Sequence, residues 1–339
     1  MLAEGRGTHR ASFLLQDLAH SGVLEAIRRD GSILLSTQMN EERLAAGKER
    51  LIEYLLPKKT RELYRQLMES DAVLSLGRLA DVGIGYVTGA NDFFHLGPDA
   101  VRLWEIPEEF LLPAIRRGRS IVGLCFDRND WLRSLNTGEA GYLLHILPNI
   151  ELPDTVRKYV ATGEQQGIAK TYKCRTREPW FAVPHVRKPD AFLSYMSGDK
   201  PHFAANDAGV VAPNSLHLVE MHDQATCSSY ELAALWRTSL TQLSAEIEGH
   251  PLGGGMLKLE PTEAENIAVA RPPKDQTISR ETIDELDALV RTGRDNEARQ
   301  FADETFLETG IGLDKRDCLL LQEAAEMLRD RRYHRGCSA

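Results

Sequence analysis

The spacing of apolar residues predicts helices near both ends of the chain. Between residues 41 and 69, leucines such as Leu44, Leu51 and Leu55 recur at helical intervals, and the pattern is interrupted at Pro57. We therefore expect two consecutive helices, or one kinked helix, in this stretch. The last sixty residues have the same helical spacing, and the helices predicted there cover residues 279–291, 296–307 and 315–332.

From residue 73 onward the pattern changes to short apolar and β-branched runs separated by glycine, which is typical of strands and turns. Strands are predicted at residues 73–74, 82–87, 93–96, 121–126, 142–146, 180–183 and 216–221, and helices at 155–162 and 230–247. These elements do not alternate as regular strand–helix–strand units. We therefore expect an α+β fold with small mixed sheets and packed helices, ending in an all-helical C-terminal segment.

The composition indicates a globular protein. With 339 residues, 42% hydrophobic and 27% charged, the chain can form one large or two ordinary globular domains. It contains no apolar run of about 18 residues, and its beginning lacks the apolar centre of a signal peptide. We therefore expect a soluble, cytoplasmic protein with no membrane partner. The five cysteines are widely spaced and odd in number, which favours reduced thiols over disulfides or a zinc ribbon.

Charge is distributed unevenly along this acidic chain. The net charge of -9 argues against a surface that binds a polyanion all over. Between residues 170 and 200, however, seven basic residues face three acidic ones, interleaved with Tyr172, Trp180 and Phe181. A second basic group closes the last predicted helix, where it either complements the helix dipole or contacts phosphate: Arg329, Arg331, Arg332, His334 and Arg335.

No nucleotide-binding loop stands out. The segment from Gly83 to Gly89 comes closest, but its glycine spacing is wrong and no acidic residue follows at the usual distance. Tight turns in a small sheet account for these glycines. The glycine run 253–255 is likewise interpreted as a flexible loop, or as one that a neighbour approaches closely.

Metal and nucleophile patterns are equally weak. His217, His222 and Asp223 lie close together, yet single histidines on strands are more often packed or solvent-facing than ligands. Cys174 with His185 would make a thiolate pair only if another group oriented the histidine, so a structural thiol is favoured. We predict no catalytic, cofactor-binding or metal-binding residue in this chain.

Five stretches in one order carry a family resemblance. The most informative is Tyr172-Lys173-Cys174-Arg175-Thr176-Arg177-Glu178-Pro179-Trp180-Phe181, and the others cover residues 76–94, 159–168, 201–217 and 237–261. Together they resemble the C-terminal target-recognition half of adenine-specific, TaqI-like DNA methyltransferases of restriction-modification systems. The resemblance spans roughly residues 60–335.

The resemblance implies a division of the chain and of the chemistry. It implies a helical lead-in over residues 1–70, a target-recognition domain over 71–272 and a helical segment over 273–339, with Arg271-Pro272-Pro273 as a linker. The family's loop for S-adenosylmethionine and its Asn-Pro-Pro-aromatic motif do not occur in these residues. The resemblance therefore implies a catalytic methyltransferase domain or subunit as partner, with S-adenosylmethionine bound there, and identifies residues 2–7 as a remnant of that domain.

The function implied is recognition of double-stranded DNA for methylation of the adenine 6-amino group. An alternative is a stand-alone DNA-binding module, for example in phage defence, that never methylates. A small-molecule enzyme with an unrecognised site is a third possibility, and it predicts no salt-dependent DNA binding. Trp180 and Phe181 could instead be core residues, and Lys188 could be merely solvated. The residues expected to contact DNA are Lys170, Tyr172, Lys173, Arg175, Arg177, Trp180, Arg187, Lys188, Asn206 and Asn214.

Overall fold

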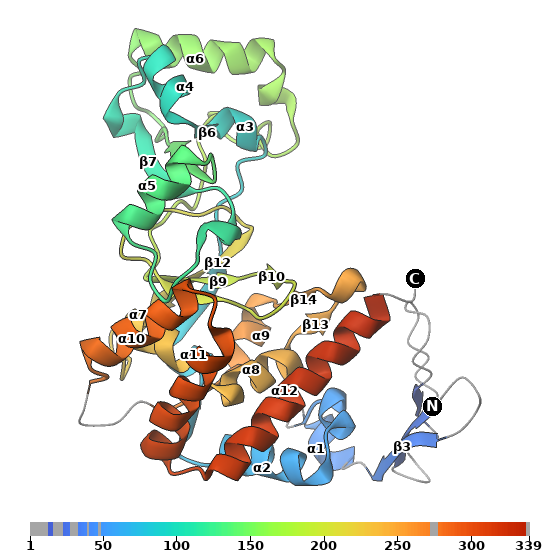
Figure 1. The fold of residues 1–339 in the computed structure, drawn as a ribbon. Helices are drawn as coiled ribbons and strands as arrows, with labels where there is room; N and C mark the ends of the chain where they lie inside the picture. Colours follow the sequence, from blue (N-terminus) through green and yellow to red (C-terminus); the bar gives the residue numbers. More distant parts are fainter. Residues whose placement is uncertain are drawn as a thin grey trace.

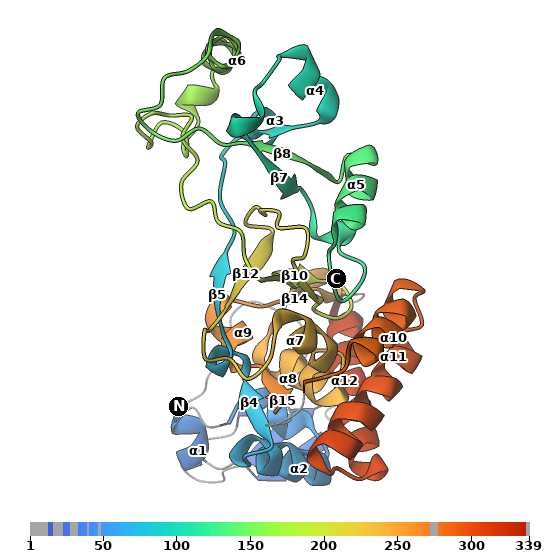
Figure 2. The same cartoon turned by 90° about the vertical axis from the view of Figure 1, so that its left-hand side faces the viewer.

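The structure is a computed structural model that describes residues 13–15, 23–27, 33–38, 41–46, 49–271 and 277–336. Figures 1 and 2 show two lobes, with a head that projects from one side of a larger body. We call residues 86–186 the head, and residues 49–85 and 187–336 the body. The head is thus a continuous excursion of the chain, because the body contains the residues on both sides of it.

The body begins with helix α2 (Lys58–Glu69), whose N-cap is Pro57. Its central sheet has the antiparallel order β11-β9-β12-β5, in which Val219 of β12 faces Val82 of β5 and Ala191 of β9. The strands are β5 (Ala80–Ile84), β9 (Ala191–Ser194), β11 (Phe203–Ala205) and β12 (Leu216–Met221). Two smaller sheets pair β4 (Val73–Ser75) with β15 (Ala268–Ala270), and β14 (Leu257–Lys258) with both β10 (Met196–Ser197) and β13 (His250–Pro251).

Helices cover this sheet and form the core of the body. Helix α8 (Ser239–Glu248) lies at its centre with almost every residue buried, and it begins where the Thr238 side chain accepts a hydrogen bond from the backbone of Thr241. Helix α12 (Lys315–Gly336) packs along α8 (Figure 1). The other helices of the body are α7 (Ser229–Leu235), α9 (Pro261–Asn266), α10 (Arg280–Arg291) and α11 (Asp295–Ala302), which continues as a π-helix (Asp303–Thr309).

The head has its own small sheet and its own core. The antiparallel strands are β6 (His95–Leu96), β8 (Ala140–Leu144) and β7 (Leu111–Ile115), in that order. The helices around them are α3 (Asn91–Phe94), α4 (Pro98–Leu103), α5 (Arg128–Asn136) and α6 (Asp154–Gln165). Phe94, Leu143 and Val156 are completely buried in this core. A third core joins head to body and contains Ile115, Phe126, Phe192 and Leu218.

The α+β class and the helical C-terminal segment are confirmed. All pairings between named strands are antiparallel, and three isolated bridges are parallel. The broken helix before residue 70 is also confirmed, as the short helices α1 (Glu41–Ala45) and Leu51–Leu55 followed by α2. In the described part of the chain, no helix is long and apolar enough to cross a membrane.

Several predicted elements were wrong. Residues 121–126 form a loop with one isolated bridge, and residues 180–183 are irregular because their apolar side chains pack onto the head core without entering a sheet. Residues 93–96 end helix α3 before the two-residue strand β6. The helix predicted over 230–247 is two helices, since Thr238 caps a new one. The described parts of residues 13–38 are the strands β1 (Phe13–Leu15), β2 (Val23–Ile27) and β3 (Ile33–Gln38), not helix. The predicted remnant 2–7 and the Pro272-Pro273 linker lie outside the described residues.

Candidate nucleic-acid interface

A long irregular loop, residues 166–190, connects α6 of the head to β9 of the body and carries most of the predicted DNA contacts. We call it the basic loop. Three of its side chains attach it to the head. The Cys174 thiol is buried and donates to the Thr88 carbonyl at 3.6 Å, and the Arg177 guanidinium donates to the carbonyls of Thr88, at 2.8 Å, and Val87. Trp180 packs on an aromatic cluster with Phe93, its ring centroid 5.5 Å away.

These attachments leave a row of cations in solvent. Lys170, Lys173, Arg175 and Lys188 are exposed, and none of them forms an ion pair with an acidic side chain among the described residues. Tyr172 is 67% exposed, and both Lys173 Nζ and Arg175 Cζ lie within 6 Å of its ring, at 5.7 and 5.5 Å. Cations without an acidic partner need not break an ion pair before they bind phosphate.

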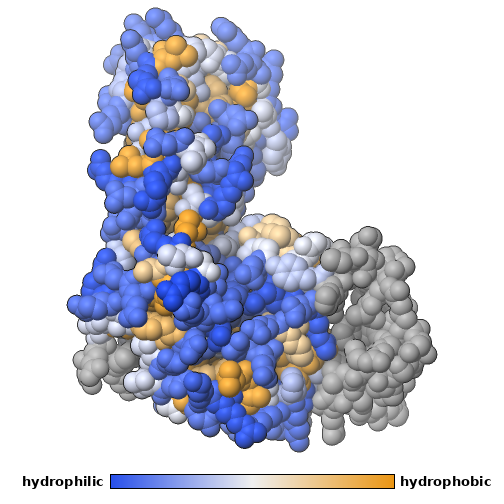
Figure 3. Space-filling model, viewed as in Figure 1, coloured by the Kyte–Doolittle hydropathy of each residue, from blue (hydrophilic) through white to orange (hydrophobic). Residues whose placement is uncertain are grey.

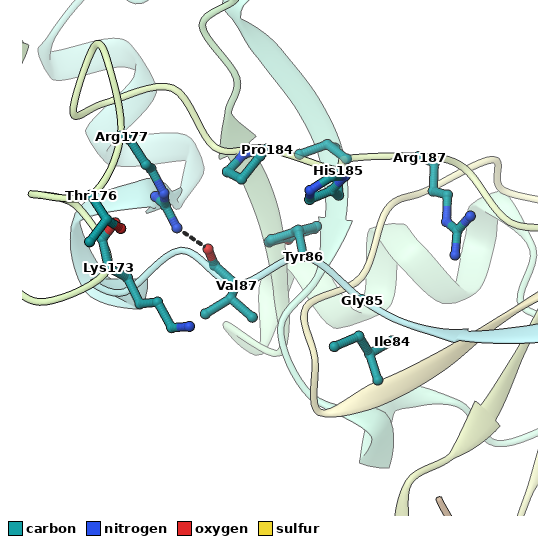
Figure 4. A pocket seen from close by; sticks show the side chains of 11 residues that line it. Ile84, Gly85, Tyr86, Val87, Lys173, Thr176, Arg177, Pro184, His185 and Arg187 are labelled. Atoms are coloured by element: carbon teal, nitrogen blue, oxygen red, sulfur yellow. Dashed lines mark hydrogen bonds between the residues drawn. The ribbon is translucent and has the colours of Figure 1, made fainter. Parts of the chain in front are cut away.

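A groove of about 590 Å³ lies between the basic loop and the segment that follows β5. Lys173 and Arg187 lie at opposite ends of it, with Tyr86 and His185 between them (Figure 4). Arg187 is held by Glu220 of β12, with 2.8 Å between Nε and Oε1. Ile84 is 55% exposed on the groove wall.

At two glycines beside this groove, other parts of the chain occupy the space that a Cβ atom would need. A Cβ on Gly85 would lie 2.3 Å from the Ala212 carbonyl oxygen, and one on Gly89, whose φ is +80°, would lie 2.6 Å from Cβ of Lys173. Gly85 therefore permits two chain segments to cross, and Gly89 permits the basic loop to pack closely. Packing within the chain therefore accounts for both glycines.

The structure assigns structural partners to three predicted contacts. Arg177 and Trp180 attach the basic loop, as described above. The Asn206 amide donates to the carbonyls of Pro189, at 2.8 Å, and Val210, at 2.9 Å, and accepts from the Val210 backbone at 3.1 Å. These three side chains hold turns in place, and we leave them out of the proposed interface. Asn214 is exposed in the turn before β12.

Several residues of the groove were not predicted from the sequence, and His185 and Ile84 are two of them. His185 has a φ of +56°, which is unusual for a residue with a side chain, and it lies in the middle of the groove. Ile84 was missed because strand alternation predicts it to be buried like Val82. Ile84 is instead exposed on the groove wall, as the last residue of β5, which is an edge strand of its sheet.

The other candidate clusters have structural partners. His217 is fully buried, and its Nε2 lies 2.8 Å from the Leu259 carbonyl. Among the described residues, no group of three or more His, Cys, Asp or Glu side chains could hold a metal ion. At the end of α12, Arg332 is 3% exposed and paired with Glu246, so its role is structural rather than phosphate contact.

Comparison with known proteins identifies the family. The model of the C-terminal domain of the type II methyltransferase M.Eco57I matches residues 48–307, which is more than half of the chain. The chain therefore belongs to this family of C-terminal domains of restriction-modification methyltransferases, as the resemblance of its motifs implied.

Two individual proteins are similar to this chain. The type II methyltransferase M.AccI of Acinetobacter calcoaceticus is 22% identical over 187 residues, which cover 54% of this chain and 34% of M.AccI. The crystal structure of the type IIG restriction endonuclease BpuSI has a TM-score of 0.55 and 15% identity, covering 84% of this chain and 34% of that one. The second likeness concerns the fold alone. The chain spans about a third of the length of both proteins.

Proposed function

We propose that this chain recognises double-stranded DNA for a restriction-modification methyltransferase, and that the exposed face of the basic loop contacts the duplex. One observation carries the proposal: among the described residues of this acidic chain most arginines pair with carboxylates, yet Lys170, Lys173, Arg175 and Lys188 have no acidic partner there and lie on one attached loop. The family supports it, since the matching model and relative are methyltransferases.

The proposed division of roles follows from chemistry. Lys170, Lys173, Arg175 and Lys188 would bind phosphates and set the register of the protein on the duplex. The exposed ring of Tyr172 is suited to packing against sugars or bases. Arg187 is less available for DNA, because its guanidinium forms an ion pair with Glu220. Asn214 would contact the duplex from the turn before β12.

The reaction served would be methylation of the adenine 6-amino group, with S-adenosylmethionine bound by a catalytic domain or subunit outside these residues. Methylation inside a duplex requires the target base to leave the stack, at a cost of a few kcal/mol. Contacts from a separate recognition lobe can offset that cost. In this proposal the chain selects and holds the DNA while the partner performs the transfer.

The proposal is tested by the salt dependence of DNA binding. Duplex binding should weaken steeply with salt, and the triple variant Lys170→Ala, Lys173→Ala, Arg175→Ala should lower the slope of log K against log salt by up to about 2.7, because each phosphate contact contributes about 0.9. Fluorescence anisotropy with a labelled duplex measures both the affinity and its slope against salt. The control removes the same number of positive charges from exposed positions of the body: Lys59→Ala, Lys315→Ala and Arg316→Ala.

An equal slope in the triple variant and the control would move the DNA surface elsewhere, and the absence of salt-dependent binding would overturn the proposal altogether. Adding a catalytic half with S-adenosylmethionine then tests the reaction. Methyl groups on adenine N6, detected by nuclease digestion and mass spectrometry, are expected. DNA binding without methylation would instead identify a stand-alone DNA-binding module.

A further inference from the structure

Gly198 and Gly253 are glycines that nothing inside the described chain requires. Neither has φ in the left-handed region, no atom lies within 4 Å of a Cβ built on Gly253, and the nearest to one on Gly198 is Met256 Sδ at an ordinary 3.8 Å. Gly97 and Gly310 also have room, but they lie at helix ends, where glycine is common. The other described glycines have a positive φ or a close neighbour.

These two glycines belong to turns that the same arginine holds. We call residues 198–200 and 253–255 the glycine turns. Arg332 of α12 donates to the carbonyls of Gly198, at 2.7 Å, Asp199, at 2.6 Å, and Gly255. Its charge is balanced by Glu246 of α8, with 2.8 Å between Nη2 and Oε1, and both residues are 3% exposed.

The anchoring is costly, because burying an ion pair removes two charges from water. Tyr333 adds a second anchor, since its hydroxyl donates to the Gly198 carbonyl at 2.6 Å. The glycine turns are thus held rigidly, and although the positive φ of Gly254 and Gly255 requires glycine there, Gly198 and Gly253 are not needed for the hold. A rigid turn with spare room at its surface is suited to close approach by another molecule.

The glycine turns face the same notch as the basic loop. Figure 1 shows β10, β13 and β14 on the part of the body beside the head, and Figure 3 shows an open notch between the head and this part of the body. The basic loop runs down the side of the head that borders the notch (Figure 1). Around the turns the exposed side chains include two apolar ones, Met196 at 44% and Leu252 at 39%, and the carboxylate of Asp199, which is paired with Arg329 Nε at 3.3 Å.

We infer that the glycine turns contact the sugar–phosphate backbone of the DNA duplex that the basic loop holds. The inference rests on the proposed function and adds a second, uncharged contact from the body. Backbone N–H groups bind phosphate without carrying sequence information, and glycine lets the backbone come within hydrogen-bond distance. The hydroxyl of Ser197, directly before Gly198, is buried with no hydrogen-bond partner among the described residues, so a further donor lies beside the turn.

Adding a single methyl group at Gly198 or at Gly253 tests this inference, because the protein without DNA has room for it. Gly198→Ala and Gly253→Ala should leave the thermal midpoint unchanged and weaken duplex binding at fixed salt by about tenfold, equivalent to about 1.4 kcal/mol. The slope of log K against log salt should stay at the wild-type value, because no charge is removed. The same anisotropy titrations measure affinity and slope, and differential scanning fluorimetry measures the midpoint.

Gly310→Ala is the matched control, since it adds a methyl at a helix end and should leave DNA binding unchanged. The inference is overturned if Gly198→Ala and Gly253→Ala both bind DNA like the wild type. That outcome is distinct from failure of the proposed function, in which the wild type itself shows no salt-dependent binding. Loss of affinity together with a lower midpoint in both variants would also overturn it, because the glycines would then be needed by the fold.

Discussion

His95 lies in the core of the head with its Nε2 atom 2.8 Å from the Tyr86 hydroxyl. Only 5% of the residue is exposed, and burial together with the nearby charge of Arg116 lowers the pKa of His95 to about 4. The ring is therefore neutral in the folded head at every pH above about 4. In the unfolded chain the same ring takes up its proton near its ordinary pKa of 6.5.

This difference predicts an acid-sensitive head. The contribution of His95 to stability is complete above about pH 6.5 and is lost progressively as the pH falls towards 4, because only the unfolded state binds the proton. Between pH 7 and pH 5 the free energy of unfolding should fall by about 2 kcal/mol from this residue. Urea unfolding of wild type and His95→Gln at both pH values checks it. Burial also lowers the pKa of His202 to about 4, but both proteins contain His202 and its effect cancels in the comparison. Equal pH dependence in the two proteins would therefore contradict the prediction.

At the same scale, the sequence predicts which residues can bind DNA but not which are free to do so. Arg177 and Arg175 belong to one basic run, yet Arg177 donates to carbonyls 89 and 90 positions earlier while Arg175 remains in solvent. Asn206 has the same ambiguity, because an amide that could read a base edge can equally close a turn. Such partners are distant in sequence, so a local pattern cannot reveal them.

At the scale of elements, the basic loop has no regular structure over most of its length and depends on its side-chain attachments. Arg177→Met removes the donors for two carbonyls and should cost about 1–3 kcal/mol. Amide hydrogen exchange across residues 171–183 should become faster, because local opening needs less free energy. The matched variant Arg175→Met alters an exposed cation of the same loop and should leave exchange unchanged. Equal exchange in both variants would show that Cys174 and Trp180 are enough to attach the basic loop without Arg177.

The elements that sequence periodicity predicted best are the long helices. Helices α2, α6, α10 and α12 have clear polar and apolar faces or helix-stop signals, and each was predicted at nearly the right place. The short strands were predicted less well. Residues 121–126 and 180–183 have strand-like composition, but they pack their apolar side chains into the cores as irregular segments, without sheet partners along their length.

At the scale of the whole molecule, one arginine links the helices on either side of the junction. Arg291 of α10 donates to Asp130 of α5 through two nitrogens, at 2.8 and 2.9 Å, and to the Cys125 carbonyl at 2.7 Å. Burial alone would raise the pKa of Asp130, but the hydrogen bonds from Arg291 and the Asp127 backbone, together with the charges of Arg291 and Arg133, outweigh it, and the pKa lies below its ordinary value. This link therefore helps to fix the head relative to the body.

Arg291→Met should loosen that link. We expect a loss of about 2–3 kcal/mol in the free energy of unfolding, because the buried carboxylate of Asp130 loses two hydrogen bonds from Arg291 and keeps only those from Arg133 and the Asp127 backbone. Small-angle X-ray scattering should show a broader range of head positions. The control Arg280→Met removes an exposed pair with Asp284 on the same helix and should cost no more than about 0.5 kcal/mol. An unchanged scattering profile with reduced stability would show that the junction core alone fixes the head.

The way the head leaves and rejoins the sheet has a consequence for how this architecture can vary. The chain departs from β5 and returns through β9, and both strands are neighbours of β12. Adjacent strands are about 4.8 Å apart, so β5 and β9 lie only about 10 Å apart across the sheet. Because β5 and β9 lie so near each other, a head of a different length or shape can be accommodated between them. The head can thus diversify while the central sheet of the body stays unchanged.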